Sequence, residues 1–131
     1  NDFALKTILR DEWGFDGFVV SDWNAVMEMI PHGYARDAKH AAELTANGGD
    51  DFEMHTDTFR KHLPELIKEG KFTEEKLNTA VRHMLRIKMR LGLWDNPYPR
   101  GNRDEIILSD EHLAAARDAA KACTRPAITT A

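Results

Sequence analysis

The sequence predicts an α/β protein rich in helix, because apolar segments of two kinds alternate along its 131 residues. Two short apolar runs, at residues 18–20 and 51–54, have strand character, and each is followed by segments whose apolar residues recur at helical spacing. This order is typical of βα units, in which helices connect parallel strands. Two strands alone cannot close a barrel or shield both faces of a parallel sheet, so we expect a piece of a larger βα domain. A small self-contained helix-rich domain is the alternative.

The apolar spacing also places the helices. They are expected at residues 4–9, 24–30, 35–47, around 63–67, 74–91 and 110–122. The first should end before the WGFDG turn, and Gly48-Gly49 should end the third, because glycine readily adopts the left-handed conformations found at helix ends. Pro64 is expected in a first turn or at a kink. Thr73 is a good N-cap for the longest helix, which Gly92 ends.

The first strand, residues 18–20 (FVV), is expected to be buried on both faces, because no charged residue interrupts it. The second fits residues 51–54 after the glycine pair. Beyond the longest helix, residues 96–102 (NPYPRGN) predict a proline-rich linker before the alanine-rich helix at 110–122.

Composition and charge exclude several classes of function. The chain has 22 acidic and 18 basic residues and a net charge of -4, which argues against attraction to nucleic acid or an anionic membrane. No apolar run approaches the roughly 20 residues of a membrane span. The single Cys123 permits neither an internal disulfide nor a cysteine zinc site. The chain begins at Asn1 without an initiator Met, so we expect a missing N-terminal part, and localisation stays open.

The most informative carboxylate is Asp22, which directly follows the first predicted strand. Functional groups gather at the carboxyl ends of strands in α/β folds. A carboxylate there can serve as a nucleophile or stabilise charge beside a sugar ring, and Trp23 would supply a flat apolar wall. Because Asp is also a favoured N-cap, spacing alone leaves capping of the next helix equally open.

Residues 9–23, LRDEWGFDGFVVSDW, closely resemble the nucleophile segment of glycoside hydrolase family 3, which includes β-glucosidases and β-xylosidases. The resemblance continues in residues 49–54 (GDDFEM), which are similar to the family's Gly-x-Asp-x-Glu-Met strand. It extends through residues 80–95 and covers roughly residues 1–122. Gly48, Asp50 and the tail at 124–131 depart from the family pattern.

The resemblance implies that the fold is the C-terminal portion of a (β/α)8 TIM-type barrel, helix-rich and incomplete. Residues 1–95 would be the last part of the family's N-terminal barrel domain, and residues 96–131 a linker and helix toward a second domain missing from this chain. By the same resemblance Asp22 is the catalytic nucleophile, and Trp23 and Met54 contact the sugar. No cofactor and no metal are implied.

The implied activity is retaining hydrolysis of terminal β-linked glucosyl residues. The nucleophile forms a covalent glycosyl-enzyme while a second carboxyl about 5 Å away protonates the leaving oxygen and later activates water. The resemblance places that acid/base beyond this chain and is compatible with a periplasmic or secreted location. The alternative is a non-catalytic remnant or interaction piece, and exposed sheet edges predict self-association.

Two other chemistries can be weighed on the residues. Residues 48–52 (GGDDF) are similar to the metal-binding hairpin signature of diguanylate cyclases, but that signature needs a strand on each side and residues 41–46 predict a helix. A metal site could be imagined from polar residues that lack ligand spacing, namely His32, His40, Asp51, His55 and Asp57. Arg82, Arg86 and Arg90 form a basic stripe, which we expect to be solvated or salt-bridged.

Overall fold

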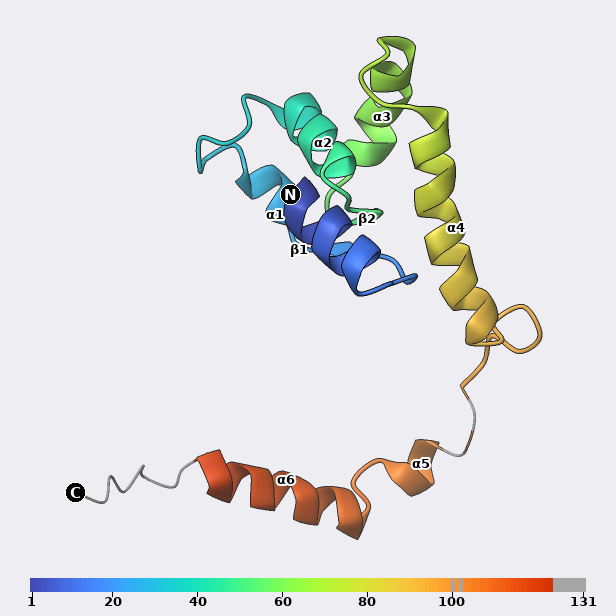
Figure 1. Ribbon diagram of the computed structural model, residues 1–131. Coiled ribbons are helices and arrows are strands. Elements are labelled where there is room, and N and C mark those ends of the chain that lie inside the picture. Colours follow the sequence, from blue (N-terminus) through green and yellow to red (C-terminus); the bar gives the residue numbers. More distant parts are fainter. Residues whose placement is uncertain (100, 102, 124–131) are drawn as a thin grey trace. The chain divides into compact units, whose positions relative to one another are not determined.

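Figure 1 shows the computed structural model, which describes residues 1–99, 101 and 103–123. The chain divides into a unit spanning Asn1–Pro97 and a second unit that begins at Tyr98. The elements are, in order, η1 (Phe3–Glu12), β1 (Val20–Trp23), α1 (Ala25–Glu28), α2 (Ala38–Asn47), β2 (Phe52–Met54), α3 (Thr58–Lys68), α4 (Glu74–Arg90), α5 (Arg103–Ile106) and α6 (Asp110–Cys123). Among the described residues, no helix is long and apolar enough to cross a membrane.

The two strands form a parallel pair, connected through α1 and α2. Val20 pairs with Phe52 and Trp23 pairs with Met54, with an irregularity between the two positions. Ser21 strengthens the pairing, because its hydroxyl oxygen accepts a hydrogen bond of 3.0 Å from the Met54 N–H. The helix-rich α/β class expected from the sequence is therefore observed.

The first strand differs from its prediction in both position and burial. It begins at Val20 rather than at residue 18, because the Val19 N–H donates to the Asp51 carboxylate instead of to a strand carbonyl. It was expected to be buried on both faces, and this is wrong: Val20 is 37% exposed and its partner Phe52 is 48% exposed. With only two described strands, the sheet cannot cover both faces of either one.

The first helices lie close to their predicted places. η1 ends at Glu12, before the expected turn, but its turns are π-helical, as in the 3.0 Å bond from the Trp13 N–H to the Ile8 carbonyl. α1 is shorter than expected. α2 starts at residue 38 rather than 35, because the Asp37 carboxylate caps it by accepting from the His40 N–H at 2.8 Å.

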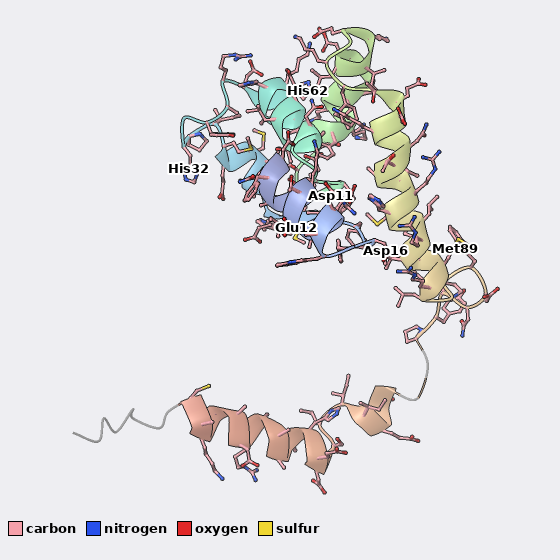
Figure 2. All side chains as sticks on the ribbon, in the orientation of Figure 1. Asp11, Glu12, Asp16, His32, His62 and Met89 are labelled. Atoms are coloured by element: carbon pink, nitrogen blue, oxygen red, sulfur yellow. The ribbon has the colours of Figure 1, made fainter. Side chains whose placement is uncertain are left out.

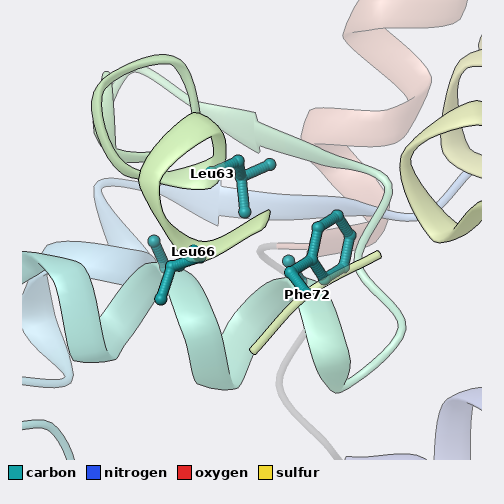
Figure 3. Close-up of a cluster of buried hydrophobic side chains, with 5 residues drawn as sticks. Leu63, Leu66 and Phe72 are labelled. Atoms are coloured by element: carbon teal, nitrogen blue, oxygen red, sulfur yellow. The ribbon is translucent and has the colours of Figure 1, made fainter. Parts of the chain in front are cut away.

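The main core lies between α2, α3 and the segment that follows α3, as the close-up in Figure 3 shows. Leu63, Leu66 and Phe72 pack there against the small side chains of Ala42 and Ala46. Alanine on α2 lets the two helices approach closely, and Leu66 becomes fully buried. A second, smaller cluster packs the other side of α2 against α1; its buried members are Val26, Ala35 and Ala41.

The two longest helices of the first unit show one success and one correction. α4 spans the expected residues, and the Thr73 hydroxyl caps it by accepting from the Lys76 N–H at 3.2 Å. α3 begins at Thr58, five residues before the predicted stretch, so Pro64 lies in its interior rather than its first turn. The short helix α5 within the second unit was not expected, whereas α6 matches its prediction. The departing tail at 124–131 lies outside the described residues.

The basic stripe on α4 is salt-bridged at its C-terminal end, as predicted. Arg90 pairs with the Asp16 carboxylate at 2.5 Å, and Arg86 donates to the Asp16 backbone carbonyl at 2.7 Å. Figure 2 labels Asp16 beside the C-terminal part of α4. The hydrogen bond from Arg90 holds the pKa of Asp16 below its usual range. These bonds fasten the WGFDG turn to α4.

Candidate active site at the carboxyl ends of the strands

Asp22 lies in the last part of β1 and is exposed to solvent. Its Oδ1 accepts a hydrogen bond of 2.7 Å from the backbone N–H of Trp23. The residue that caps α1 is Asn24, with a φ of 58° and no side-chain cap bond. The hypothesis that Asp22 is merely an N-cap is therefore wrong, and its carboxylate stands free of α1 at the carboxyl end of the strand.

The three site residues predicted from the sequence lie on adjoining strands. Trp23 follows Asp22 directly, and Met54 pairs with Trp23 across the sheet. The Asn24 N–H also donates to the Met54 carbonyl at 3.2 Å, which continues the pairing beyond β1. The sheet register therefore brings the ends of the two strands together, and with them the predicted nucleophile and both predicted sugar contacts.

An aromatic pair that the sequence did not predict lies at the same carboxyl ends of the strands. The His55 imidazole stacks on the Trp23 indole with ring centroids 3.8 Å apart and planes inclined by 13°. His55 has a φ of 72° and Asn24 a φ of 58°, so each strand is followed by a residue in the left-handed region. Non-glycine residues in that region cost conformational energy and are common at functional sites. The sequence offered His55 only as a metal ligand.

A buried carboxylate fixes the loop after β2. Glu53 accepts hydrogen bonds from the Thr56 and Thr58 hydroxyls and, at 2.7 Å, from the Phe59 N–H. Three donors compensate the burial of this carboxylate. Because Thr58 and Phe59 form the first turn of α3, Glu53 ties that helix to the end of the strand. Its role was missed because the GDDFEM segment reveals no bonding partner.

A second carboxylate joins the amino ends of the strands. Asp51 Oδ2 accepts from Arg10 Nη2 at 2.6 Å and from the Val19 N–H at 2.9 Å, while Oδ1 bonds to His83 Nδ1 at 3.0 Å. Arg10 also donates to the Gly17 carbonyl at 3.0 Å. This Asp51 hub connects η1, the start of β1, β2 and α4. It lies at the opposite end of the strands from Asp22.

The structure does not bring the candidate metal ligands named from the sequence together into a site. Within residues 1–99, 101 and 103–123, no group of three or more His, Cys, Asp or Glu side chains could hold a metal ion. Asp57 instead pairs with Arg60, whose hydrogen bond lowers the pKa of Asp57. A pocket of about 310 Å³ lies beside the aromatic pair, and Asn24, His55 and His62 contribute to its lining. Figure 2 labels His62 on α3.

The departures from the family pattern at Gly48 and Asp50 have structural consequences. A Cβ at Gly48 would lie 2.8 Å from the Leu44 carbonyl oxygen, so an alanine there would force a shift. Asp50 is half-buried, and that burial raises its pKa. The helical α2 directly before them rules out the cyclase hairpin, which requires a strand at that place.

Comparison with known proteins identifies the class to which this fold and site belong. The model of the glycosyl hydrolase family 3 N-terminal domain matches residues 1–87. The chain therefore belongs to glycosyl hydrolase family 3, as its motifs indicated.

Individual relatives include a periplasmic β-glucosidase of Salmonella typhimurium, 44% identical over 98 residues, which make up 75% of this chain and 13% of the relative. A xylan 1,4-β-xylosidase of Xylanibacter ruminicola is 36% identical over 94 residues, 71% of this chain and 11% of that protein. The crystal structure of a Listeria innocua β-glucosidase in complex with glucose matches with a TM-score of 0.83 and 44% identity, covering 91% of this chain and 16% of that one. The matched part of the chain thus spans only 11% to 16% of the length of these relatives.

Proposed function

We propose that this chain carries the nucleophile of a retaining β-glucosidase, with Asp22 attacking the anomeric carbon of a terminal β-linked glucosyl residue. The observation that carries the proposal is an exposed carboxylate at the carboxyl end of β1, in a segment that resembles the family's nucleophile segment. The two groups expected to contact the sugar, Trp23 and Met54, pair directly across the sheet.

The proposed reaction begins when an Asp22 oxygen forms a bond to the anomeric carbon and the glycosidic bond to the leaving oxygen breaks. A second carboxyl group donates a proton to that oxygen, and the same group then removes a proton from the water that releases the sugar. The family resemblance assigns this acid/base to a region outside this chain. The indole of Trp23 would supply an apolar surface for the C–H face of the sugar.

Covalent trapping tests the proposal directly. The chain is mixed with a 2-deoxy-2-fluoro glucoside carrying an activated leaving group, which needs little acid assistance, and the added glycosyl mass is located by peptide mapping. We expect an adduct on Asp22 that is absent from Asp22→Asn and present in the Asp11→Asn control, whose exposed side chain lies on η1 (Figure 2). A parallel xylosyl reagent compares the two sugars named among the relatives.

A non-catalytic role is the second candidate, and the observation that favours it is that the chain spans 13% of the Salmonella relative. In that case the chain binds or associates without forming a glycosyl-enzyme. Absence of an adduct with both reagents, on a chain shown to be folded by circular dichroism, would establish this alternative and refute the nucleophile proposal for the chain by itself.

We also propose that residues 1–95 correspond to the last part of a (β/α)8 barrel domain and residues 96–131 to a linker and helix. The parallel β1–β2 pair with its helical connection supports the first part. Limited proteolysis should cut near residue 96 and leave a folded N-terminal product. Cleavage that destroys the fold of residues 1–95 would contradict this division.

We also propose that the chain self-associates through the exposed edges of its sheet. Val20 and Phe52 are substantially exposed on a sheet whose two described strands each leave one edge open. Light scattering after size exclusion should give a mass that rises with concentration. A strictly monomeric mass with a sharp cooperative melt would contradict this expectation.

A further inference from the structure

We propose that His55 is a positioning residue for the sugar site: its imidazole fixes the indole of Trp23 in the orientation that a sugar ring meets beside Asp22. The inference rests on the proposed function, because it gives the stacked pair a role in that site. His55 itself need not touch the sugar; it acts through the ring on which it stacks.

The geometry of the pair is that of a defined stack rather than a chance contact. The two ring centroids are 3.8 Å apart and the planes are nearly parallel, so the imidazole covers one face of the indole. Trp23 nevertheless remains 60% exposed, which leaves much of its ring surface available to a ligand. An exposed indole without such a neighbour is free to change rotamer, whereas a stacked one is held in place.

The backbone around the pair is built to bring the rings together. Trp23 and Met54 are partners in the parallel register, so His55 comes directly after the partner of Trp23. The bond from the Asn24 N–H to the Met54 carbonyl fastens the chain on both sides of the stack. His55 then leaves the extended conformation with its φ of 72°, which ends the strand at the residue that stacks.

The left-handed conformation of His55 is itself informative. Non-glycine residues seldom adopt this backbone, although histidine does so more often than most, and the surroundings hold it in place. The buried Glu53 imposes it from one side, by tying β2 to the first turn of α3 through the Phe59 N–H and the Thr58 hydroxyl. A left-handed residue whose ring stacks on a predicted sugar contact, the residue that follows Asp22 in the chain, points to a functional constraint.

The expected benefit is preorganisation. A sugar that binds against a mobile indole must order that side chain, and the ordering reduces affinity and slows attack by Asp22. When His55 already holds the ring, this cost falls on folding instead of on binding. The same reasoning predicts that any flat aromatic ring at position 55 restores the effect, whereas a small polar side chain does not.

Three variants of the full chain test the proposal. His55→Asn removes the ring but retains a residue that tolerates the left-handed region, and His55→Phe retains a flat ring. His32→Asn is the matched control, because His32 is exposed in the connection between α1 and α2 (Figure 2). Circular dichroism confirms that each variant is folded. Trp23→Leu tests the stack from its other side and keeps the test available if His55→Asn does not fold.

The first readout is NMR of the rings, which needs no ligand. We expect the imidazole carbon-bound protons of His55 to be shifted upfield relative to the other five histidines by the ring current of the indole. That shift should disappear in Trp23→Leu. In His55→Asn the indole N–H signal of Trp23 should move toward its unstructured position, while those of Trp13 and Trp94 stay fixed. Unshifted His55 protons in the wild type would overturn the proposal.

The second readout is the rate of trapping by the 2-deoxy-2-fluoro glucoside. The rate on Asp22 should fall roughly three- to tenfold in His55→Asn, the cost of ordering one side chain, recover in His55→Phe and stay unchanged in His32→Asn. Equal rates in all variants would overturn the positioning role and leave the proposed function standing. No adduct on the wild-type chain would refute the proposed function, and the role of His55 in a sugar site with it.

Discussion

Replacing Asp51 by alanine should destabilise the first unit severely, because Asp51 is the shared acceptor of a buried network. Its side chain is 8% exposed, and those of its partners Arg10 and His83 are 17% and 14% exposed. Removing the carboxylate leaves the Arg10 guanidinium desolvated without its counter-charge. It also removes the acceptor of the Val19 N–H, which lies directly before β1.

The size of the effect follows from the cost of an uncompensated buried charge. Breaking a buried ion pair by removing one partner costs about 3 to 5 kcal/mol. Domains are stable by only about 5 to 15 kcal/mol in total, so Asp51→Ala should lose a large share of the free energy of unfolding. Asp51→Asn should lose less, because its amide oxygen can still accept from the Val19 N–H while the charge opposite Arg10 is gone.

Urea unfolding followed by circular dichroism measures these differences. Asp11→Ala is the control, since Asp11 is an exposed carboxylate one residue from Arg10 and its loss should change stability by no more than about 0.5 kcal/mol. A double-mutant cycle with Arg10→Ala should show strong coupling, because each single variant already removes the shared bond. A loss below about 1 kcal/mol for Asp51→Ala, or additive effects in the cycle, would refute the reasoning.

Three further predictions concern stability. Burial raises the pKa of Asp50, so the folded state holds that proton more tightly and stability falls as the pH rises through the folded pKa. In urea titrations, Asp50→Asn should therefore be more stable than the wild type at pH 7. This gain should vanish at about pH 3, below the ordinary aspartate pKa. Hydrogen bonds from Lys39 and Lys71 lower the pKa of Glu69 to about 2. The contribution of Glu69 to folding stability is therefore present above the ordinary pKa of 4.5 and is lost as the pH falls toward 2. In Glu69→Gln this loss of stability in acid should be smaller, and an unchanged dependence of stability on pH would contradict the prediction. Leu66→Ala should cost about 2 to 5 kcal/mol through the cavity it leaves in the main core, whereas a loss within 1 kcal/mol would mean that the core collapses around it.

Local signals predicted the helices well because each such signal acts within a few residues. Thr73 caps α4 and Gly49, with its φ of 107°, follows the end of α2, and both effects depend only on nearby backbone groups. The start of α3 was missed because the residue that binds its first turn lies outside the usual capping positions, five and six residues upstream. That residue is Glu53, which binds the Thr58 hydroxyl and the Phe59 N–H from the preceding strand.

The candidate site was predictable only to the extent that a motif carried it. The position of Asp22 after an apolar run, and the resemblance of its segment to a family segment, made Asp22 the candidate nucleophile, which stays a prediction. The sheet register that brings Trp23 beside Met54 is a property of two strands about thirty residues apart, and the stack with His55 depends on a left-handed backbone. No spacing rule predicts such a conformation at a given histidine, because non-glycine residues as a whole seldom adopt it.

The described residues around Asp22 supply only part of what a retaining glycosidase site needs. In the described residues the Asp22 carboxylate accepts a hydrogen bond from the Trp23 N–H and is otherwise open to solvent. A nucleophilic carboxylate in a retaining glycosidase works with a second carboxyl about 5 Å away and with groups that grip the sugar and exclude water. The strands β1 and β2 supply one carboxylate and a preformed aromatic surface. The hydrogen bonds of Glu53 and Asp51 fix the segments that follow and precede these strands. A trapping reagent that dispenses with acid assistance is therefore the sharpest probe of this chain, because it does not require the acid/base that the family resemblance places outside the chain.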